Sequence, residues 1–325
     1  MRKRIIMGAV EKDLTLKEAF DLFIKMKTIS NLSHDTILYY ERCYKPLEDY
    51  YGGESLCQNI DEDTFYGVLE HIKATRNVSP ITINTYIRGF RAIFNFFMER
   101  KYIAPFKMRL IKCEKPIKET YTEYEINKLI QKPDVNACTF AEFRNWAVVC
   151  HLLGTGNRLK TIINLKIGDI DVETMEIKLK TVKNKKPYII PMSTALKKVY
   201  AEYLKHRGGE AGEYLFCTSH GTQIASDSMK SAIKAYNKSR GISKTSIHLF
   251  RHTFAKNWVM NGGDIFRLQK ILGHSSLEMV KEYVSMFGVD IKENFDDFNA
   301  LDNHTHGNDK VKITMNTARK NRRNG

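Results

Sequence analysis

The sequence lacks the features that mark membrane and secreted proteins. Among its 325 residues no apolar run approaches the ~20 residues that a membrane span requires. The basic residues 2–4 are followed by only three apolar residues, 5–7, which are too few for the apolar segment of a secretory signal. We therefore expect a cytoplasmic protein with no membrane partner.

The cysteines also lack the close spacing that is typical of metal-binding and redox sites. The six cysteines are scattered along the chain, and no two of them form a C-x-x-C pair. We expect reduced thiols that pack as small apolar side chains. No metal and no cofactor is assigned to them.

What the sequence has in excess is positive charge. Lysine and arginine number 52 against 37 aspartates and glutamates, which gives a formal net charge of +15. Such an excess repels itself and predicts a polyanionic partner, DNA or RNA. Surface solvation is the competing explanation. The length is sufficient for two domains, each with its own core.

The first hundred residues predict four amphipathic helices. Capping residues open them at Thr15, Ser33, Asp61 and Ser79, and apolar side chains then recur at spacings of three and four. We expect a tail at residues 1–12 and a helical domain at 13–104. Basic residues around the last helix are candidates for phosphate contacts, against the alternative of a solvated polar face; they are Arg88, Arg91, Arg100 and Lys101.

The helical pattern breaks between Pro105 and Pro116, which bracket a basic stretch. Residues 105–121 are therefore expected to form an interdomain linker that lets two basic domains close around a duplex. The second domain should span residues 122–300. The polar, basic residues 301–325 show no apolar periodicity and are expected to be disordered.

The second domain predicts mostly helices and one β-hairpin. A capping box opens it at Thr122 and Glu125. The period changes to two around Ile177 and Leu179 and again at 188–190, which predicts a hairpin with its tip at 183–186. Further helices are expected near Arg158 and at about 140–154, 194–206, 226–238, 247–260, 263–271 and 276–286. The predicted fold class is mostly α with a small antiparallel β-sheet.

Six side chains in this domain suit chemistry on a phosphodiester. Phosphoryl transfer depends on positioning and on stabilising negative charge, for which planar guanidinium groups are well shaped. A tyrosine can be the nucleophile if a base or a cationic pocket compensates for its usual pKa of about 10. The candidates are Arg158, Lys183, His248, Arg251, His274 and Tyr283.

Each candidate also has an ordinary structural explanation. His248 and Arg251 are three residues apart and share one face of a helix, a spacing that is common by chance. Lys183, at the hairpin tip, can protonate a leaving 5′ oxygen, and Lys185 and Lys186 compete for that role. His274 lies just before a capping box at Ser275 and can reach a phosphate oxygen. Taken singly, a solvated lysine or a surface histidine is the commoner outcome.

Taken together, the order of these motifs resembles the tyrosine recombinase family, which includes phage integrases and the Xer recombinases. The matching segments are 153–158 (Leu-Gly-Thr-Gly-Asn-Arg), 183–186 (Lys-Asn-Lys-Lys), 248–255 (His-Leu-Phe-Arg-His-Thr-Phe-Ala), 271–276 (Ile-Leu-Gly-His-Ser-Ser) and 280–283 (Val-Lys-Glu-Tyr). The apolar-proline end of the second hairpin strand at Pro191 selects Lys183. The resemblance covers about residues 13–300. It implies a SAM-like helical core-binding domain, then a catalytic domain with the DNA breaking-rejoining fold.

The resemblance also implies a reaction that needs neither metal nor ATP. Tyr283 would form a 3′-phosphotyrosyl bond and release a 5′ hydroxyl. His248 would act as base or orienting group, and His274 would support the phosphate. Four subunits would act on two sites in double-stranded DNA, with residues 289–298 either docking into a neighbouring subunit or packing within their own. The sequence leaves open whether an accessory or directionality protein takes part.

Two features depart from the family's pattern. Thr161 stands where members often carry Glu or Asp three residues after the first arginine, and a hydroxyl cannot neutralise that arginine. No arm-binding domain is expected before residue 13, which favours a compact Xer-like or transposon-type enzyme. The competing functions are a cleavage-inactive DNA-binding protein of the same fold and an enzyme like a type IB topoisomerase.

Overall fold

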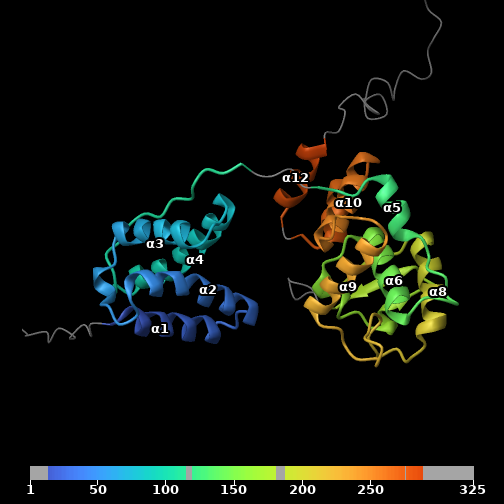
Figure 1. The fold of residues 1–325 in the computed structure, drawn as a ribbon, viewed down its shortest axis with the longest axis horizontal. Coiled ribbons are helices and arrows are strands. Elements are labelled where there is room, and N and C mark those ends of the chain that lie inside the picture. Colours follow the sequence, from blue (N-terminus) through green and yellow to red (C-terminus); the bar gives the residue numbers. More distant parts are fainter. Residues whose placement is uncertain (1–13, 115–118, 181–186, 275, 288–325) are drawn as a thin grey trace, which may run out of the picture. The chain divides into compact units, whose positions relative to one another are not determined.

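The computed structural model describes residues 14–114, 119–180, 187–274 and 276–287. The chain divides after Pro116 into two compact units, the N-terminal unit and the C-terminal unit (Figure 1). In the described ranges, no helix has the length and apolar character needed to cross a membrane. The predicted hairpin tip, Ser275, residues 289–298 and both terminal tails lie outside the described residues.

The N-terminal unit contains the four predicted helices. They are α1 (Leu16–Ile29), α2 (His34–Tyr51), α3 (Glu62–Thr75) and α4 (Pro80–Glu99), with a short 3-10 helix, η1 (Cys57–Asn59), before α3. Each α-helix begins directly after its predicted capping residue. At the first, the Thr15 amide donates to the Glu18 carboxylate at 3.0 Å and the Glu18 amide donates back to the Thr15 hydroxyl at 3.2 Å. The prediction from capping and periodicity is confirmed.

Aromatic side chains dominate the core between these helices. Phe23, Phe65, Phe90, Phe94 and Phe97 are fully buried. The rings of Phe90 and Phe94 stack at 5.9 Å, and those of Phe65 and Phe90 meet edge to face at 6.4 Å. Both arrangements are favourable for aromatic quadrupoles. The helical faces that the sequence marks as apolar are therefore the ones that pack together.

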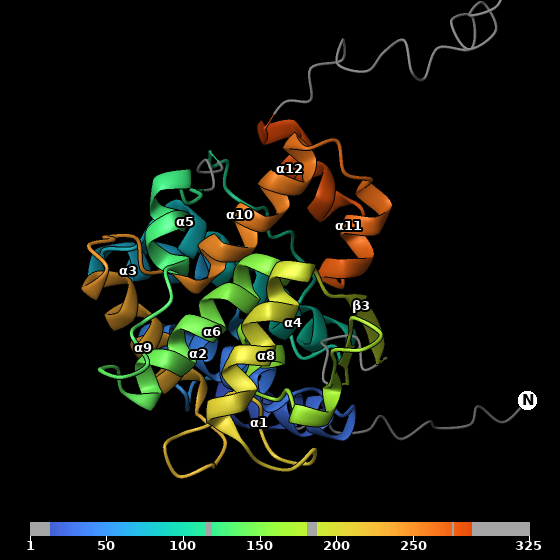
Figure 2. The same ribbon diagram turned by 90° about the vertical axis from the view of Figure 1, so that its right-hand side faces the viewer.

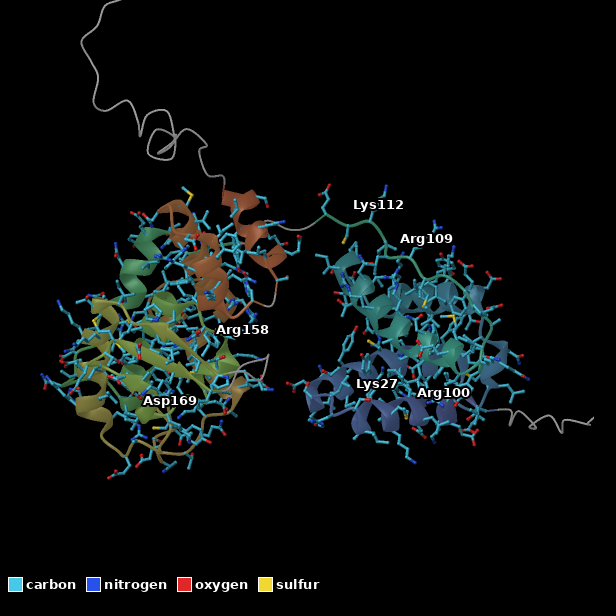
Figure 3. All side chains as sticks on the ribbon, turned by 180° about the vertical axis from the view of Figure 1, so that it is seen from behind. Lys27, Arg100, Arg109, Lys112, Arg158 and Asp169 are labelled. Atoms are coloured by element: carbon cyan, nitrogen blue, oxygen red, sulfur yellow. The ribbon has the colours of Figure 1, made fainter. Side chains whose placement is uncertain are left out.

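The segment after α4 is bound along that helix. The Asn84 amide donates to the Ile111 carbonyl at 2.8 Å and accepts from the Ile111 amide at 2.9 Å. Arg91 donates to the Met108 carbonyl at 2.9 Å, so this guanidinium serves the protein's own backbone. Arg109 and Lys112 remain exposed and point away from the helices (Figure 3). The described first half of the predicted linker is thus held to the N-terminal unit.

The C-terminal unit is built around α6. Its helices are α5 (Glu123–Ile130), α6 (Phe140–Thr155), α7 (Leu159–Ile162), α8 (Thr194–Arg207), α9 (Ser226–Ser239), α10 (Ile247–Met260), α11 (Ile265–Leu272) and α12 (Glu278–Phe287). Helix α6 is apolar on most of its surface and packs against α5, α8, α9 and α10 (Figure 2). Helices α11 and α12 pack on α10 at one end of the unit. Helix α10 therefore joins the central helix to the C-terminal pair.

A three-stranded antiparallel sheet completes this unit. Its strands are β1 (Ile170–Asp171), β2 (Glu176–Leu179) and β3 (Tyr188–Pro191), in that order, and a short 3-10 helix, η2 (Ile167–Asp169), precedes β1. Ile177 pairs with Ile190 and both are buried, as the period-two pattern predicts. The predicted hairpin is confirmed. Strand β1 was not predicted, because two residues carry no alternation to detect.

Candidate active site

The turn between α6 and α7 presents the first arginine. Gly156 ends α6 in the left-handed conformation, with φ of 62°. A Cβ atom on Gly156 would lie 2.7 Å from the Phe254 ring and 2.8 Å from the Leu272 side chain. Only glycine therefore lets the end of α6 approach α10 and α11 this closely. Arg158 follows two residues later as the capping position of α7.

A buried hydrogen-bond network on the core side of this turn holds it in place. The Asn157 amide group donates to His151 Nε2 at 3.2 Å, which leaves the His151 proton on Nδ1, facing the Tyr200 hydroxyl. Thr155 donates its hydroxyl to the His151 carbonyl at 2.7 Å and accepts from the Asn157 backbone. Burial lowers the pKa of His151 to about 3, so this imidazole is neutral and structural.

Arg158 and Arg251 converge on the turn that follows α11. Arg251 is 5% exposed and donates to the Gly156 carbonyl at 2.8 Å and to the Leu272 carbonyl at 2.9 Å. Arg158 reaches the Leu272 and Gly273 carbonyls at 3.4 Å each. Burial first, and Arg158 second, lower the pKa of Arg251 to about 10, which leaves it charged at neutral pH. Two cations therefore share one small volume.

The same turn carries His274. This side chain is 7% exposed, and its Nε2 atom contacts the Arg251 guanidinium. The His274 amide donates to the Gln269 carbonyl at 3.0 Å, and the Gln269 side chain donates to the His274 carbonyl at 3.2 Å. Gly273 adopts a φ of 60°, and a Cβ there would lie 2.7 Å from the Tyr188 hydroxyl on β3. The turn after α11 is thus held by hydrogen bonds to Gln269 on one side and by close packing against Tyr188 on the other.

Tyr283 projects from α12 toward this group. It is 3% exposed, and its hydroxyl lies 2.9 Å from Nδ1 of His252 on α10. Burial raises the pKa of Tyr283, while attraction and hydrogen bonding by Arg251 and attraction by Arg158 oppose that rise. His252 was absent from the candidates drawn from the sequence. Its place beside Arg251 in the His-Leu-Phe-Arg-His segment was the available signal.

His248 lies one turn before His252 and borders a basic cavity. Burial, followed by the charges of Arg251 and Arg158, lowers the pKa of His248, which favours the neutral imidazole at neutral pH. The cavity has a volume of about 440 Å³. Its basic lining residues are Arg158, Lys160, Lys230, Lys234 and His248, and the remaining wall is formed by Leu159, Ser226, Ser231, Thr245, Ser246 and Ile247. Such a lining suits phosphate oxygens.

Five of the six predicted site residues lie in the described part of the chain. Lys183 and its competitors Lys185 and Lys186 lie outside it. Lys180, which precedes the tip, pairs with the buried Asp169 carboxylate at 2.6 Å and fixes the base of the hairpin. Figure 3 labels Arg158 and Asp169 in the C-terminal unit. Thr161 belongs to α7, where its amide donates to the Arg158 carbonyl at 2.9 Å.

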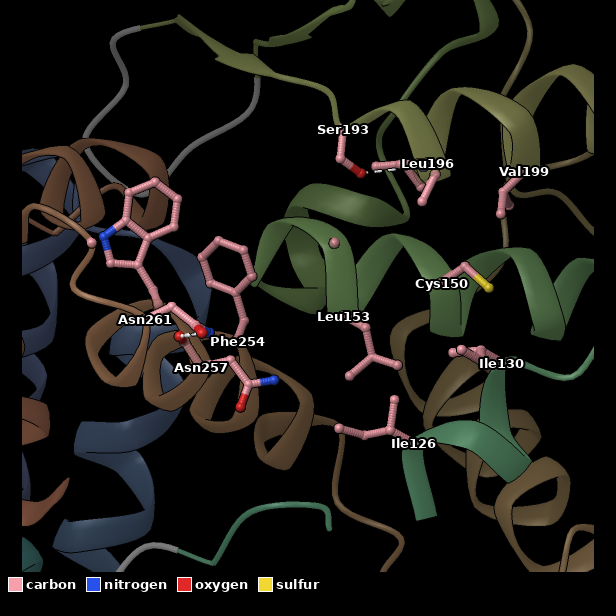
Figure 4. Close-up of a pocket in the computed structure, with 14 residues that line it drawn as sticks. Ile126, Ile130, Cys150, Leu153, Ser193, Leu196, Val199, Phe254, Asn257 and Asn261 are labelled. Carbon is pink, nitrogen blue, oxygen red and sulfur yellow. Dashed lines mark hydrogen bonds between the residues drawn. The ribbon is translucent and has the colours of Figure 1, made fainter. Parts of the chain in front are cut away.

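A second, larger cavity in this unit is apolar. It measures about 670 Å³ and lies among side chains of α5, α6, α8 and α10, with Ile126, Leu153, Leu196 and Phe254 in its wall (Figure 4). None of the six predicted site residues is part of its described lining. The groups suited to phosphate chemistry therefore gather elsewhere, around the turn after α11.

Comparison with known proteins identifies the family. The sequence profile of the phage integrase family matches residues 119–287, which is more than half of the chain. The chain belongs to the phage integrase family. Tyrosine recombinase XerA of Pyrococcus furiosus is 30% identical over 225 residues, which cover 68% of this chain and 76% of that protein. Tyrosine recombinase XerD of Staphylococcus haemolyticus is 25% identical over 295 residues, which cover 87% and 98%.

Solved structures establish the same fold. The Tn1549 transposon integrase in complex with a circular intermediate DNA has a TM-score of 0.67 at 22% identity and covers 82% of this chain and 94% of its own. A lambda integrase tetramer bound to a Holliday junction has a TM-score of 0.69 at 16% identity and covers 94% and 82%. The fold is mostly helical with a small antiparallel sheet, as predicted. Family membership also makes the chain an enzyme, a tyrosine-type site-specific recombinase.

Proposed function

We propose that the chain cleaves and rejoins double-stranded DNA at a specific site through a 3′-phosphotyrosyl bond to Tyr283. The observation that carries this proposal is the buried Tyr283 phenol beside Arg251, whose guanidinium shares the turn after α11 with Arg158 and His274. A nucleophile, two cations and a further donor around one turn supply the attack and the charge stabilisation that phosphoryl transfer needs.

Arg158 and Arg251 neutralise the two non-bridging oxygens in this proposal. Guanidinium groups form paired, charge-assisted hydrogen bonds to phosphate, and both arginines are held by backbone carbonyls before DNA arrives. Their orientation therefore costs little at the moment of reaction. His274 donates to a phosphate oxygen, and Thr161 leaves the Arg158 charge undiminished.

The proton and bond changes are those of a direct exchange. Tyr283 attacks phosphorus, the bond to the 5′ oxygen breaks, and Lys183 protonates that leaving oxygen as general acid. His248 acts as base or orienting group. A second 5′ hydroxyl then attacks the phosphotyrosyl bond and releases the phenol. Because one phosphoester replaces another, the cycle consumes no ATP, and the arginines supply the charge stabilisation that a metal ion would otherwise give.

Assembly on DNA is part of the same proposal. The net charge of +15, with Arg109 and Lys112 exposed in the N-terminal unit, supports backbone contacts that weaken steeply with salt. The lambda integrase neighbour is a tetramer on a Holliday junction, and we propose four subunits on two DNA sites for this chain also. Cytoplasmic location and carriage by a mobile element also belong to the proposal.

The test is formation of a covalent adduct. Duplexes enriched from a random library by binding to the chain are nicked near each end, so that a short 5′-hydroxyl fragment diffuses away after cleavage. Wild-type protein should form a protein–DNA adduct that survives denaturant. Tyr203→Phe, which removes a hydroxyl that donates to the Leu215 carbonyl at 3.0 Å, is the matched control and should form it equally. The absence of any wild-type adduct would contradict the proposal.

The general acid has its own test. Lys183→Ala should slow cleavage of the ordinary substrate but cleave a substrate whose leaving group is a 5′ thiol at nearly the wild-type rate, because a thiolate departs without a proton. Without that rescue, Lys183 is not the general acid. The same pair of substrates then ranks Lys185→Ala and Lys186→Ala.

A further inference from the structure

The proposed reaction assigns no role to the hydrogen bond between His252 and Tyr283. His252 lies on α10 and Tyr283 on α12, two helices that pack together. Nδ1 of the imidazole is 2.9 Å from the phenol oxygen, and the ring centroids are 5.7 Å apart with planes inclined by 51°. The imidazole thus presents its edge to the hydroxyl. When its proton sits on Nε2, Nδ1 offers a lone pair to the phenol proton.

A base at this position answers a need that the pocket itself creates. Burial raises the pKa of Tyr283, so at neutral pH the nucleophile is a neutral phenol. Arg251 and Arg158 oppose the rise without reversing it. Attack on phosphorus therefore requires that the proton leave as the new bond forms. A base must lie within about 2.6–3.2 Å of that proton's oxygen, and His252 Nδ1 does.

We propose that His252 is the general base of the cleavage step: its Nδ1 takes the Tyr283 proton as the phenol oxygen bonds to phosphorus. This inference rests on the proposed function. The O–H bond breaks as the oxygen–phosphorus bond forms, the bond to the 5′ oxygen breaks, and that oxygen takes its proton from the general acid. On rejoining, the imidazolium returns its proton to the departing phenolate. His248, which lines the basic cavity, is then left to orient the phosphate.

Charged and titratable groups on several packed elements interact with Tyr283 or with Arg251, the cation beside it. The groups are Arg251 and His248 on α10, Arg158 before α7, Tyr188 on β3, His274 in the turn after α11 and Glu282 on α12.

Two substitutions separate a base from an orienting contact. His252→Ala removes both functions. His252→Asn places an amide near the position of Nδ1, so it can still hydrogen-bond the phenol but cannot take its proton. Both variants should form the adduct about 100-fold or more slowly than wild type at pH 7 in single turnovers, with unchanged DNA affinity. His206→Asn, a change to an exposed histidine on α8, is the matched control.

The pH profile provides a readout that a structural defect does not change. The wild-type rate should rise with pH and level off once the base is neutral. In both variants the rate should continue to rise, about tenfold per pH unit, because only the growing phenolate fraction reacts. Thermal unfolding of each variant, followed in parallel, checks that the fold is intact.

The outcomes are unambiguous. Slow Ala and Asn variants whose rates climb with pH support the proposal. An Asn variant at the wild-type rate, or variants slowed by the same factor at every pH, would overturn it. These results also separate the two proposals, since the substrate is a half-site that wild type already cleaves. If the wild-type protein forms no adduct, the proposed recombination chemistry is wrong. If His252→Asn forms the adduct as fast as wild type, only the role of His252 as general base is wrong.

Discussion

The two units bury different kinds of side chain. Among its described residues the N-terminal unit buries one polar side chain, Asn84, within an aromatic and aliphatic core. The C-terminal unit buries many more, and these are Arg144, Asn145, His151, Thr155, Asn157, Asp169, Asn237, Arg251, Thr253 and His274. A buried polar group destabilises a fold unless it is well hydrogen-bonded. The many buried polar side chains of the C-terminal unit are therefore candidates for a functional role as well as a structural one.

Burial alone does not distinguish the functional groups, however. Arg144 is as buried as Arg251, but it donates to the Cys217 carbonyl and to its neighbour Asn145, inside the domain core. Arg251 instead lies next to a second cation, Arg158, and to the buried phenol of Tyr283. Both guanidinium groups are bonded within the protein, but Arg251 is held beside a like charge that an anionic ligand would offset, as its proposed role requires.

The largest contrast between the units should come from tyrosine-to-phenylalanine changes. Tyr283→Phe removes the oxygen that we propose as the nucleophile, so no covalent adduct should form at any time or pH. Tyr44→Phe in the N-terminal unit removes a hydroxyl that meets Glu48 at 3.3 Å and should leave the adduct rate unchanged. Gel separation after denaturation measures both. An adduct with Tyr283→Phe would show that another residue attacks the DNA.

The next effect concerns the paired cations. Arg251→Lys keeps one charge but cannot span the Gly156 and Leu272 carbonyls while also binding phosphate. Single-turnover cleavage should fall about 100- to 1000-fold, the usual loss when one preorganised donor to developing charge is removed. Arg144→Lys is the matched change away from the site. If the two variants cleave at the same rate, Arg251 is only structural.

Acid should destabilise the C-terminal unit selectively. The folded pKa of His151 is about 3, below the usual 6.5, so below about pH 6.5 only the unfolded chain takes up this proton. The contribution of neutral His151 to the free energy of unfolding is fully present above that pH. Below it, toward pH 3, this contribution falls by up to about 1.4 kcal/mol per pH unit. Hydrogen exchange at pH 7 and pH 5 measures each unit separately. Equal losses in both units, or an unchanged slope in His151→Gln, would contradict this account.

The smallest predicted effect tests the N-terminal unit's own buried polar group. Asn84→Ala removes both hydrogen bonds to Ile111 and should lower the free energy of unfolding of this unit by about 1–3 kcal/mol. Chemical denaturation measures the loss. Cleavage of saturating DNA should be unaffected, because Asn84 serves only to hold the segment after α4. A variant that binds and folds normally but cleaves slowly would assign Asn84 to the chemistry instead.

The sequence predicts what local interactions determine. Caps at Ser33 and Asp61 and the apolar spacing after them give helices whose starts agree with the structure. The two-residue strand β1 exists only because β2 pairs with it, and the Asn84–Ile111 bonds join residues 27 apart, so neither leaves a local pattern. In the same way, the contact of His252 with Tyr283 spans 31 residues and depends on the packing of α10 and α12. The catalytic roles of the six residues stay predictions.

The chemical identity of the bond to DNA tests directly whether Tyr283 is the nucleophile. The adduct is digested with protease and nuclease, and the peptide that retains a nucleotide is sequenced by mass spectrometry. We predict a single nucleotide, linked through its 3′ phosphate to the phenol of Tyr283. A nucleotide on any other residue, or a linkage through a 5′ phosphate, would contradict the account.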